Sequence, residues 1–164
     1  MFNSNKYRVI ACLNLSISMA FLITGCSESK QAECQRFIKL VNQGNSLIEK
    51  NKGSQVVLSL ELAKDLQDVT EKIEKQNFQD EKLEDLKNQY VKNFATKSKN
   101  IESAAKALGS AKTAEVSPQG RDQVRQAKKD IETSLKQVKN AAEESDTLAN
   151  QLNEYCTQTE SELE

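Results

Sequence analysis

Histidine and tryptophan are absent from this 164-residue chain, and proline occurs only once. Without histidine there is no Ser–His or Cys–His nucleophile pair and no histidine-ligated zinc or haem. The di-iron class of four-helix proteins is excluded too, because its metal ligands include a Glu-x-x-His motif. A glycine-rich phosphate-binding loop is also missing. We therefore expect a protein that is not an enzyme and that holds no metal and no cofactor.

Residues that favour tight turns are scarce as well. The chain contains five glycines and a single proline, Pro118. A strand-rich domain needs a turn about every 8–12 residues, so this scarcity argues against a β-protein. Apolar residues instead recur at three- and four-residue steps, which is the spacing of one face of an α-helix. The sequence thus predicts an all-α protein.

Four stretches of helical periodicity are separated by short breaks. They cover residues 30–51, 55–75, 81–112 and 118 to about 157. Ser54, Asp80 and Ser117 are placed to cap the last three stretches, because each side-chain oxygen is able to accept a hydrogen bond from a free backbone amide. Pro118 then occupies the first helical position, where its missing donor costs nothing.

Each stretch carries an apolar stripe that is too narrow to be stable alone, so the stripes must pack together. Short connections favour an antiparallel up-down-up-down four-helix bundle, with the long third and fourth helices forming an elongated, coiled-coil-like hairpin. The alternative is an elongated antiparallel coiled coil of the last two helices, with the first two packed along part of it. The stripes are Cys34, Phe37, Ile38, Val41 and Ile48; Leu62, Leu66, Val69 and Ile73; Leu83, Leu86, Tyr90, Phe94, Ile101, Ala105 and Leu108; and Val124, Ile131, Leu135, Val138, Ala142, Leu148 or Ala149, Leu152 and Cys156.

The region before residue 26 differs from the rest of the chain. Lys6 and Arg8 form a short basic start, and residues 9–23 are mostly apolar. This is the pattern of a secretory signal peptide, and the apolar segment is short for a transmembrane helix, which needs about 20 apolar residues. We therefore expect a signal peptide here, with an uncleaved signal anchor as the alternative.

The tetrapeptide Ile-Thr-Gly-Cys at residues 23–26 ends this segment and resembles the lipobox of bacterial lipoproteins. The resemblance implies cleavage before Cys26, a lipid on Cys26, and anchoring to a bacterial membrane facing the periplasm or exterior. Ser27 is not the Asp that retains some lipoproteins of enteric bacteria in the inner membrane. The outer membrane is therefore favoured, with a thylakoid lumen or plasma membrane as alternatives.

On this interpretation the chain has four parts. Residues 1–25 are a cleaved signal peptide, 26–33 a lipidated tether, 34–157 the helical bundle and 158–164 a frayed acidic tail. The segment from Cys26 onward is long enough for one domain.

Cysteine usage adds a long-range constraint. Cys12 would leave with the signal peptide and Cys26 would carry the lipid, so Cys34 and Cys156 remain as a pair in an exported protein. In an antiparallel four-helix bundle, the start of the first helix and the end of the fourth lie at the same pole. The sequence therefore predicts a structural disulfide between Cys34 and Cys156, with two buried thiols that never meet as the alternative.

The chain also resembles a group of small, uncharacterised helical lipoproteins of cyanobacteria. The shared features are a cysteine soon after the anchor, in Glu33-Cys34-Gln35, a cysteine near the end, in Tyr155-Cys156, and helical repeats between them. The resemblance implies no activity.

Charge is distributed in blocks along the chain. Residues 26–86 have a net charge of −3, residues 87–139 of +7 and residues 140–164 of −7. The basic block is either a solvated face or a docking face for an acidic envelope protein. Nucleic acid is not expected as a partner, because aromatic stacking residues are not interleaved with the basic ones. The expected contributors are Lys97, Lys99, Lys106, Lys112, Arg121, Arg125, Lys128 and Lys129.

These observations predict a lipid-anchored, non-enzymatic adaptor or assembly module that presents a helical surface to another envelope component. The alternative is a carrier of a lipid or small molecule in a cavity between helices. A core in which bulky layers give way to small residues would indicate the carrier. The interruption at Gly44 and Asn45 in the first helix is a faint sign of such a cavity.

Overall fold

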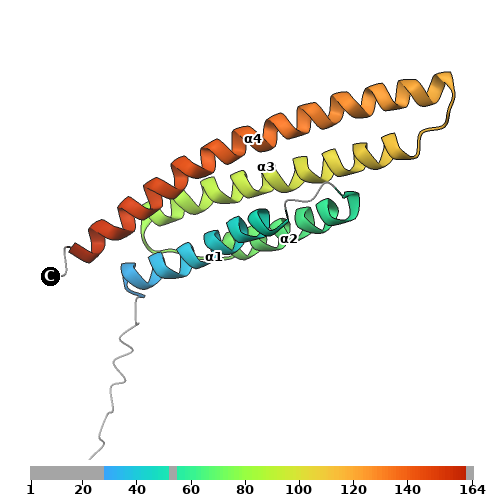
Figure 1. The fold of residues 1–164 in the computed structure, drawn as a ribbon. Coiled ribbons are helices and arrows are strands. Elements are labelled where there is room, and N and C mark those ends of the chain that lie inside the picture. Colours follow the sequence, from blue (N-terminus) through green and yellow to red (C-terminus); the bar gives the residue numbers. More distant parts are fainter. Residues whose placement is uncertain (1–27, 52–54, 162–164) are drawn as a thin grey trace, which may run out of the picture.

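The computed structural model describes residues 28–51 and 55–161 of the chain. Within these residues it contains four helices and no strand: α1 (Lys30–Lys50), α2 (Val56–Glu74), α3 (Glu81–Lys112) and α4 (Pro118–Ser161). The helices run up, down, up and down (Figure 1), which confirms the predicted all-α four-helix bundle. The signal peptide, the lipobox and Cys26 lie outside the described residues.

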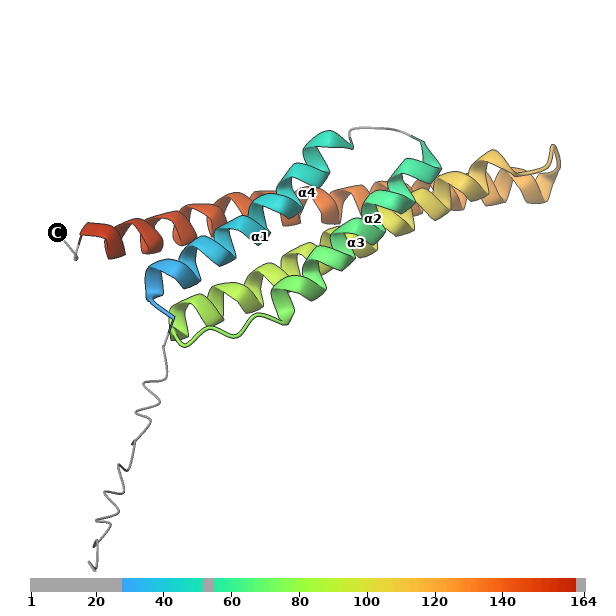
Figure 2. The same cartoon turned by 90° about the horizontal axis from the view of Figure 1, so that it is seen from below.

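The third helix lies between two neighbours. It packs along α4 on one side and against the shorter α2 on another, while α1 contacts all three other helices. In the described part of the chain, α2 and α4 make no close contact, so they lie on a diagonal of the bundle. Figures 1 and 2 show that α3 and α4 continue beyond α1 and α2 and meet in a loop at the far end. We call residues 99–139 the distal hairpin, and the opposite end, where α1 begins and α4 ends, the proximal pole.

Two of the three predicted caps are present. The Asp80 carboxylate accepts a hydrogen bond from the Leu83 amide at 3.0 Å, and the Ser117 hydroxyl accepts one from the Gly120 amide at 3.0 Å. The third, Ser54, lies outside the described residues. These bonds satisfy amides that the first turn of a helix leaves without an intrahelical partner.

The helix boundaries differ from the predicted parts of the chain at both ends of the bundle. The helix α1 begins at Lys30, with the Ser29 hydroxyl accepting a hydrogen bond from the Ala32 amide, so residues 30–33 of the predicted tether are helical. The helix α4 extends to Ser161, into the predicted tail. Both segments lack proline and glycine, so nothing in them stops a helix.

The core contains an aromatic row in the proximal half of the bundle. The ring of Phe37 lies 5.2 Å from that of Phe78 and 5.5 Å from that of Tyr90, between ring centroids, and Phe94 continues the row. Gly44 of α1 faces Phe94, and a Cβ atom built on Gly44 would lie 2.7 Å from Phe94 Cζ. Gly44 therefore accommodates the Phe94 ring, while its neighbour Asn45 lines a pocket between α1, α3 and α4.

The predicted stripe of α4 is wrong in part. Val124 and Leu135 are 43% and 54% exposed, and Ala142 is exposed as well. Small residues take the buried positions instead, and four of the buried residues follow one another at seven-residue steps, which is the repeat of a coiled-coil seam. The residues of this seam are Ala127, Ser134, Ala141 and Leu148. Small side chains allow α3 and α4 to approach closely, whereas our prediction favoured the larger apolar residues.

Cys34 and Cys156 meet at the proximal pole. The sulfur atoms of Cys34 and Cys156 lie 2.09 Å apart, at bonding distance, although 122 positions separate them in sequence. The structure thus contains the predicted pairing. None of the helices in the described part of the chain combines the length and the apolar character needed to cross a bilayer.

Candidate functional site

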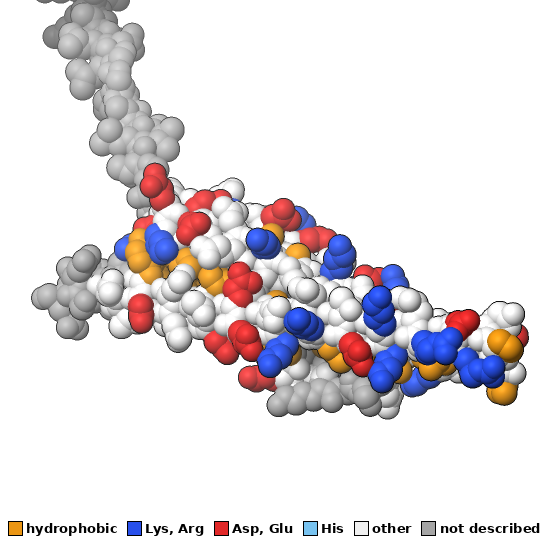
Figure 3. All heavy atoms as spheres, turned by 90° about the horizontal axis from the view of Figure 1, so that it is seen from above, with side chains coloured by type: hydrophobic (Ala, Val, Ile, Leu, Met, Phe, Trp, Pro, Cys, Tyr) orange, Lys and Arg blue, Asp and Glu red, His pale blue; other side chains and the backbone are white. Residues whose placement is uncertain are grey.

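The basic residues expected to form a docking face gather on the distal hairpin. Figure 3 shows Lys and Arg side chains along this part of the molecule and apolar side chains at its end. Seven of the eight expected residues are exposed, three on α3 and four on α4. They are Lys99, Lys106, Lys112, Arg121, Arg125, Lys128 and Lys129.

Some of these charges are paired within their own helix. Lys106 lies 2.6 Å from a carboxylate oxygen of Glu102, and Arg125 forms an ion pair with Asp122. Such exposed pairs contribute little to stability and are screened by salt. Among the described residues, no carboxylate lies within 4.0 Å of Lys112 or Arg121. Both are therefore free to meet the acidic groups of another protein.

The loop between α3 and α4 presents an apolar residue at the end of the hairpin. Val116 is fully exposed, and with Val124 and Arg121 it lines a surface hollow of about 430 Å³. Gly120 is required here, because a Cβ atom on it would lie 1.8 Å from the Glu115 carbonyl oxygen. The sequence did not single out Val116, because one valine in a predicted loop belongs to no apolar stripe.

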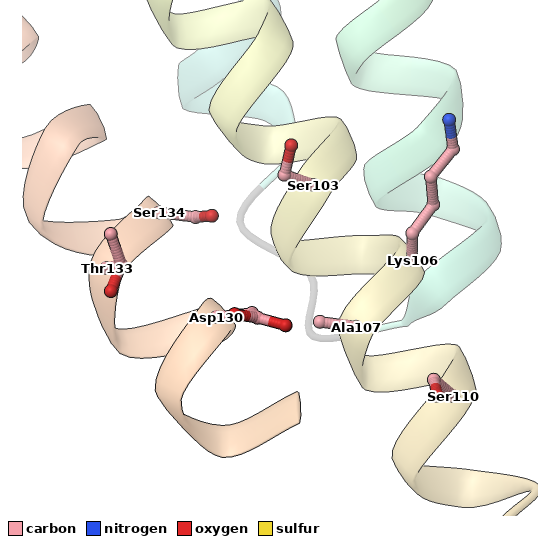
Figure 4. A pocket seen from close by; sticks show the side chains of 7 residues that line it. All are labelled: Ser103, Lys106, Ala107, Ser110, Asp130, Thr133 and Ser134. Carbon is pink, nitrogen blue, oxygen red and sulfur yellow. The ribbon is translucent and has the colours of Figure 1, made fainter. Parts of the chain in front are cut away.

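A second hollow, of about 530 Å³, lies between α3 and α4 within the distal hairpin. In Figure 4, Asp130 and Ser134 of α4 point toward α3, where Ala107 faces them, while Lys106 points away from α4. The residues that line this hollow are mostly small and polar. None of them forms a hydrogen-bonded pair of a nucleophile and a base. In the part of the chain that the structure describes, no three His, Cys, Asp or Glu side chains are grouped so that they could hold a metal ion.

The eighth basic residue, Lys97, does not belong to the docking face, and its assignment there is wrong. Its side chain is 3% exposed, because this position of α3 faces α4. The Lys97 ammonium donates to the Ser145 hydroxyl, which in turn donates to Asn93 Oδ1 at 2.7 Å. Burial lowers the pKa of Lys97 to about 8, although the nearby Asp146 and Glu144 carboxylates act in the opposite direction.

The proximal pole is joined by polar contacts between segments distant in sequence. The buried Glu33 carboxylate of α1 accepts a hydrogen bond from the Gln79 amide at 2.8 Å, in the connection between α2 and α3. The Arg36 guanidinium lies 4.9 Å from the Phe78 ring centroid in the same connection. These contacts join α1 to the connection between α2 and α3 at the proximal pole. Toward the end of the distal hairpin, α1 and α2 no longer cover α3 and α4 (Figures 1 and 2).

No family model, no curated protein and no solved structure matches the chain.

Proposed function

We propose that this protein is a lipid-anchored, non-enzymatic adaptor of a bacterial envelope whose distal hairpin docks an acidic partner protein. The observation that carries the proposal is the position of the seven exposed basic residues along the hairpin, which ends at the exposed Val116. A basic rim around an apolar contact is a common composition for a protein interface, and the charges would steer an acidic partner toward it.

The shape of the molecule supports this use of the hairpin. The helix α4 has 44 residues, which corresponds to a length of about 65 Å. Cys26 precedes Cys34 by eight residues, so a lipid on Cys26 would bring the proximal pole to the membrane surface. The distal hairpin would then point away from the lipid, where an envelope protein has access to it.

The proposal is tested by crosslinking in intact cells, with the lipidated protein as bait. We expect one envelope protein to be recovered with the wild type and lost with Lys112→Glu/Arg121→Glu. The matched control is Lys64→Glu/Lys72→Glu, which makes the same change in net charge on exposed positions of α2 and should retain the partner. A Cys26→Ala bait tests whether anchoring is needed. Equal recovery with both charge-reversal variants would overturn the assignment of the hairpin.

A further inference from the structure

Two lysines of α3 are buried, and their surroundings differ. The Lys87 ammonium donates to the Gln76 carbonyl oxygen at 3.0 Å and to the Glu84 carboxylate. Lys97, which is 3% exposed, donates to the Ser145 hydroxyl, and no carboxylate of the described residues lies within 4.0 Å of its nitrogen. An ammonium group has three donors, and a buried charge is costly unless it is paired. The Lys97 charge thus lacks a close counter-ion.

Lys97 lines a pocket. The pocket has a volume of about 260 Å³ and lies between the second half of α1, the middle of α3 and α4. Its apolar lining comes from all three helices: Ile48 of α1, Ile101 of α3, and Val138, Ala142 and Ala149 of α4. The pocket thus combines aliphatic surface with one buried cation, and binding pockets for small molecules commonly pair apolar walls with a few polar groups.

The polar lining defines the charge that the pocket accepts. Besides Lys97 it consists of Asn45, Ser145, Glu49 and Asp146. Glu49 and Asp146 are exposed to solvent, which screens their charges. The Lys97 ammonium is shielded from solvent, and at a buried position its attraction for an anion is several times stronger than in water. The two carboxylates still oppose a ligand with several negative charges. The pocket therefore favours one negative charge over two or three.

We infer that this pocket binds a short aliphatic monocarboxylate, whose carboxylate pairs with the Lys97 ammonium and whose hydrocarbon part lies against Ile48, Ile101 and Val138. The inference is independent of the docking of a protein on the distal hairpin, because none of these residues lies on the exposed basic face. A fatty acid and the C-terminus of a peptide offer the same carboxylate. We assign the fatty acid, because the lining offers aliphatic surface where a peptide would present its amides.

The test is calorimetric titration of the full chain with octanoate, compared with octan-1-ol, citrate and N-acetyl-leucine. We expect saturable binding of one octanoate per chain, and binding at least tenfold weaker for each of the other three. Lys97→Met should weaken octanoate binding at least tenfold. The exposed Lys99→Met is the matched control and should bind as the wild type does.

A second variant tests the pocket without changing the charge. Ala149→Leu fills space in the pocket and should also weaken octanoate binding at least tenfold, so the inference remains testable even where Lys97→Met fails to fold. Absence of saturable octanoate binding to the wild type, or unchanged binding by both variants, would overturn the inference. Tighter binding of N-acetyl-leucine than of octanoate would overturn it in favour of a peptide C-terminus.

Discussion

The Tyr155 hydroxyl, near the end of α4, donates a 2.6 Å hydrogen bond to Asp80, the residue whose other carboxylate oxygen caps α3. One carboxylate thus connects the last turns of the chain to the start of its central helix. Burial alone would raise the pKa of Asp80, but the hydrogen bonds from Tyr155 and Leu83 and the charge of Lys30 outweigh it and lower the pKa. Lys30 lies 3.9 Å from the Tyr155 ring centroid and completes the group.

Substituting Tyr155 and substituting Asp80 should lower the free energy of unfolding by different amounts. Tyr155→Phe loses one hydrogen bond, and we expect the free energy of unfolding to fall by about 1 kcal/mol. Asp80→Ala loses the helix cap as well, and we expect a loss of about 2 kcal/mol. Urea unfolding measures both, with the exposed Asp68→Ala as a control that should change nothing. Because the pKa of Asp80 is lowered on folding, its contribution should be present above pH 3.8 and disappear below it.

Reduction of the Cys34–Cys156 pair should destabilise the whole bundle. A bond across 122 positions of sequence restricts the unfolded chain, and the chain-entropy treatment gives a contribution of about 4–5 kcal/mol. We expect the urea midpoint of the wild type to fall when a reducing agent is added. The double variant Cys34→Ser/Cys156→Ser should unfold at that lower midpoint with or without the agent. A midpoint that does not respond to reduction would show that the bond is absent in solution.

Two glycines of the bundle should respond oppositely to substitution by alanine. At Gly44 the new Cβ atom would lie 2.7 Å from the Phe94 ring, so we expect Gly44→Ala to destabilise by about 1–3 kcal/mol. At Gly109 the nearest atom, Val56 Cγ1, would lie at an ordinary 3.7 Å. There the better helix propensity of alanine should stabilise the protein by up to about 1 kcal/mol. Thermal unfolding of the two variants compares them directly, and destabilisation at both sites would contradict the packing difference.

Stability should rise with pH in the range where Lys97 titrates. Its pKa is about 8 in the folded protein against 10.5 for an ordinary lysine. Between these values the unfolded chain binds more protons, so the free energy of unfolding should increase from pH 8 toward pH 10.5. The charges of Asp146 and Glu144, which face this group, act to raise its pKa, but burial outweighs them, so they do not reverse the sign. Lys97→Met should flatten the rise, whereas Lys99→Met should keep it, as measured by urea unfolding between pH 7.5 and 9.5.

The bundle itself was predictable because its signals are local. Asp80 and Ser117 mark helix starts by chemistry that acts within one turn, and the apolar spacing of α2 identifies its buried face from Leu62 to Ile73. The pairing of Cys34 with Cys156 followed from the up-down-up-down order. Each of these features follows from residue types and their spacing along the chain, which the sequence shows directly.

The parts that escaped prediction depend on the distance between two helices. Ala127 and Ser134 are buried because α3 approaches α4 closely, while the larger Leu135 lies outside the seam. Lys97 carries the same charge as its neighbour Lys99, and only the direction in which each side chain points separates a buried cation from an exposed one. Hydropathy depends only on the type of side chain. It therefore predicts the wrong buried face of a helix where small or charged residues are the ones that a neighbouring helix covers.

The pairing of Cys34 with Cys156 also determines how the molecule carries a mechanical load. A pull between the chain just before Cys34 and the loop at Val116 has two routes, one through α1, α2 and α3 and one through the bond into α4. The second route contains fewer residues, so α4 bears the tension. The helices α1, α2 and α3 do not unfold under this pull until α4 itself is stretched. The bond and α4 therefore transmit a pull between the tip of the hairpin and the proximal pole while the other three helices stay folded.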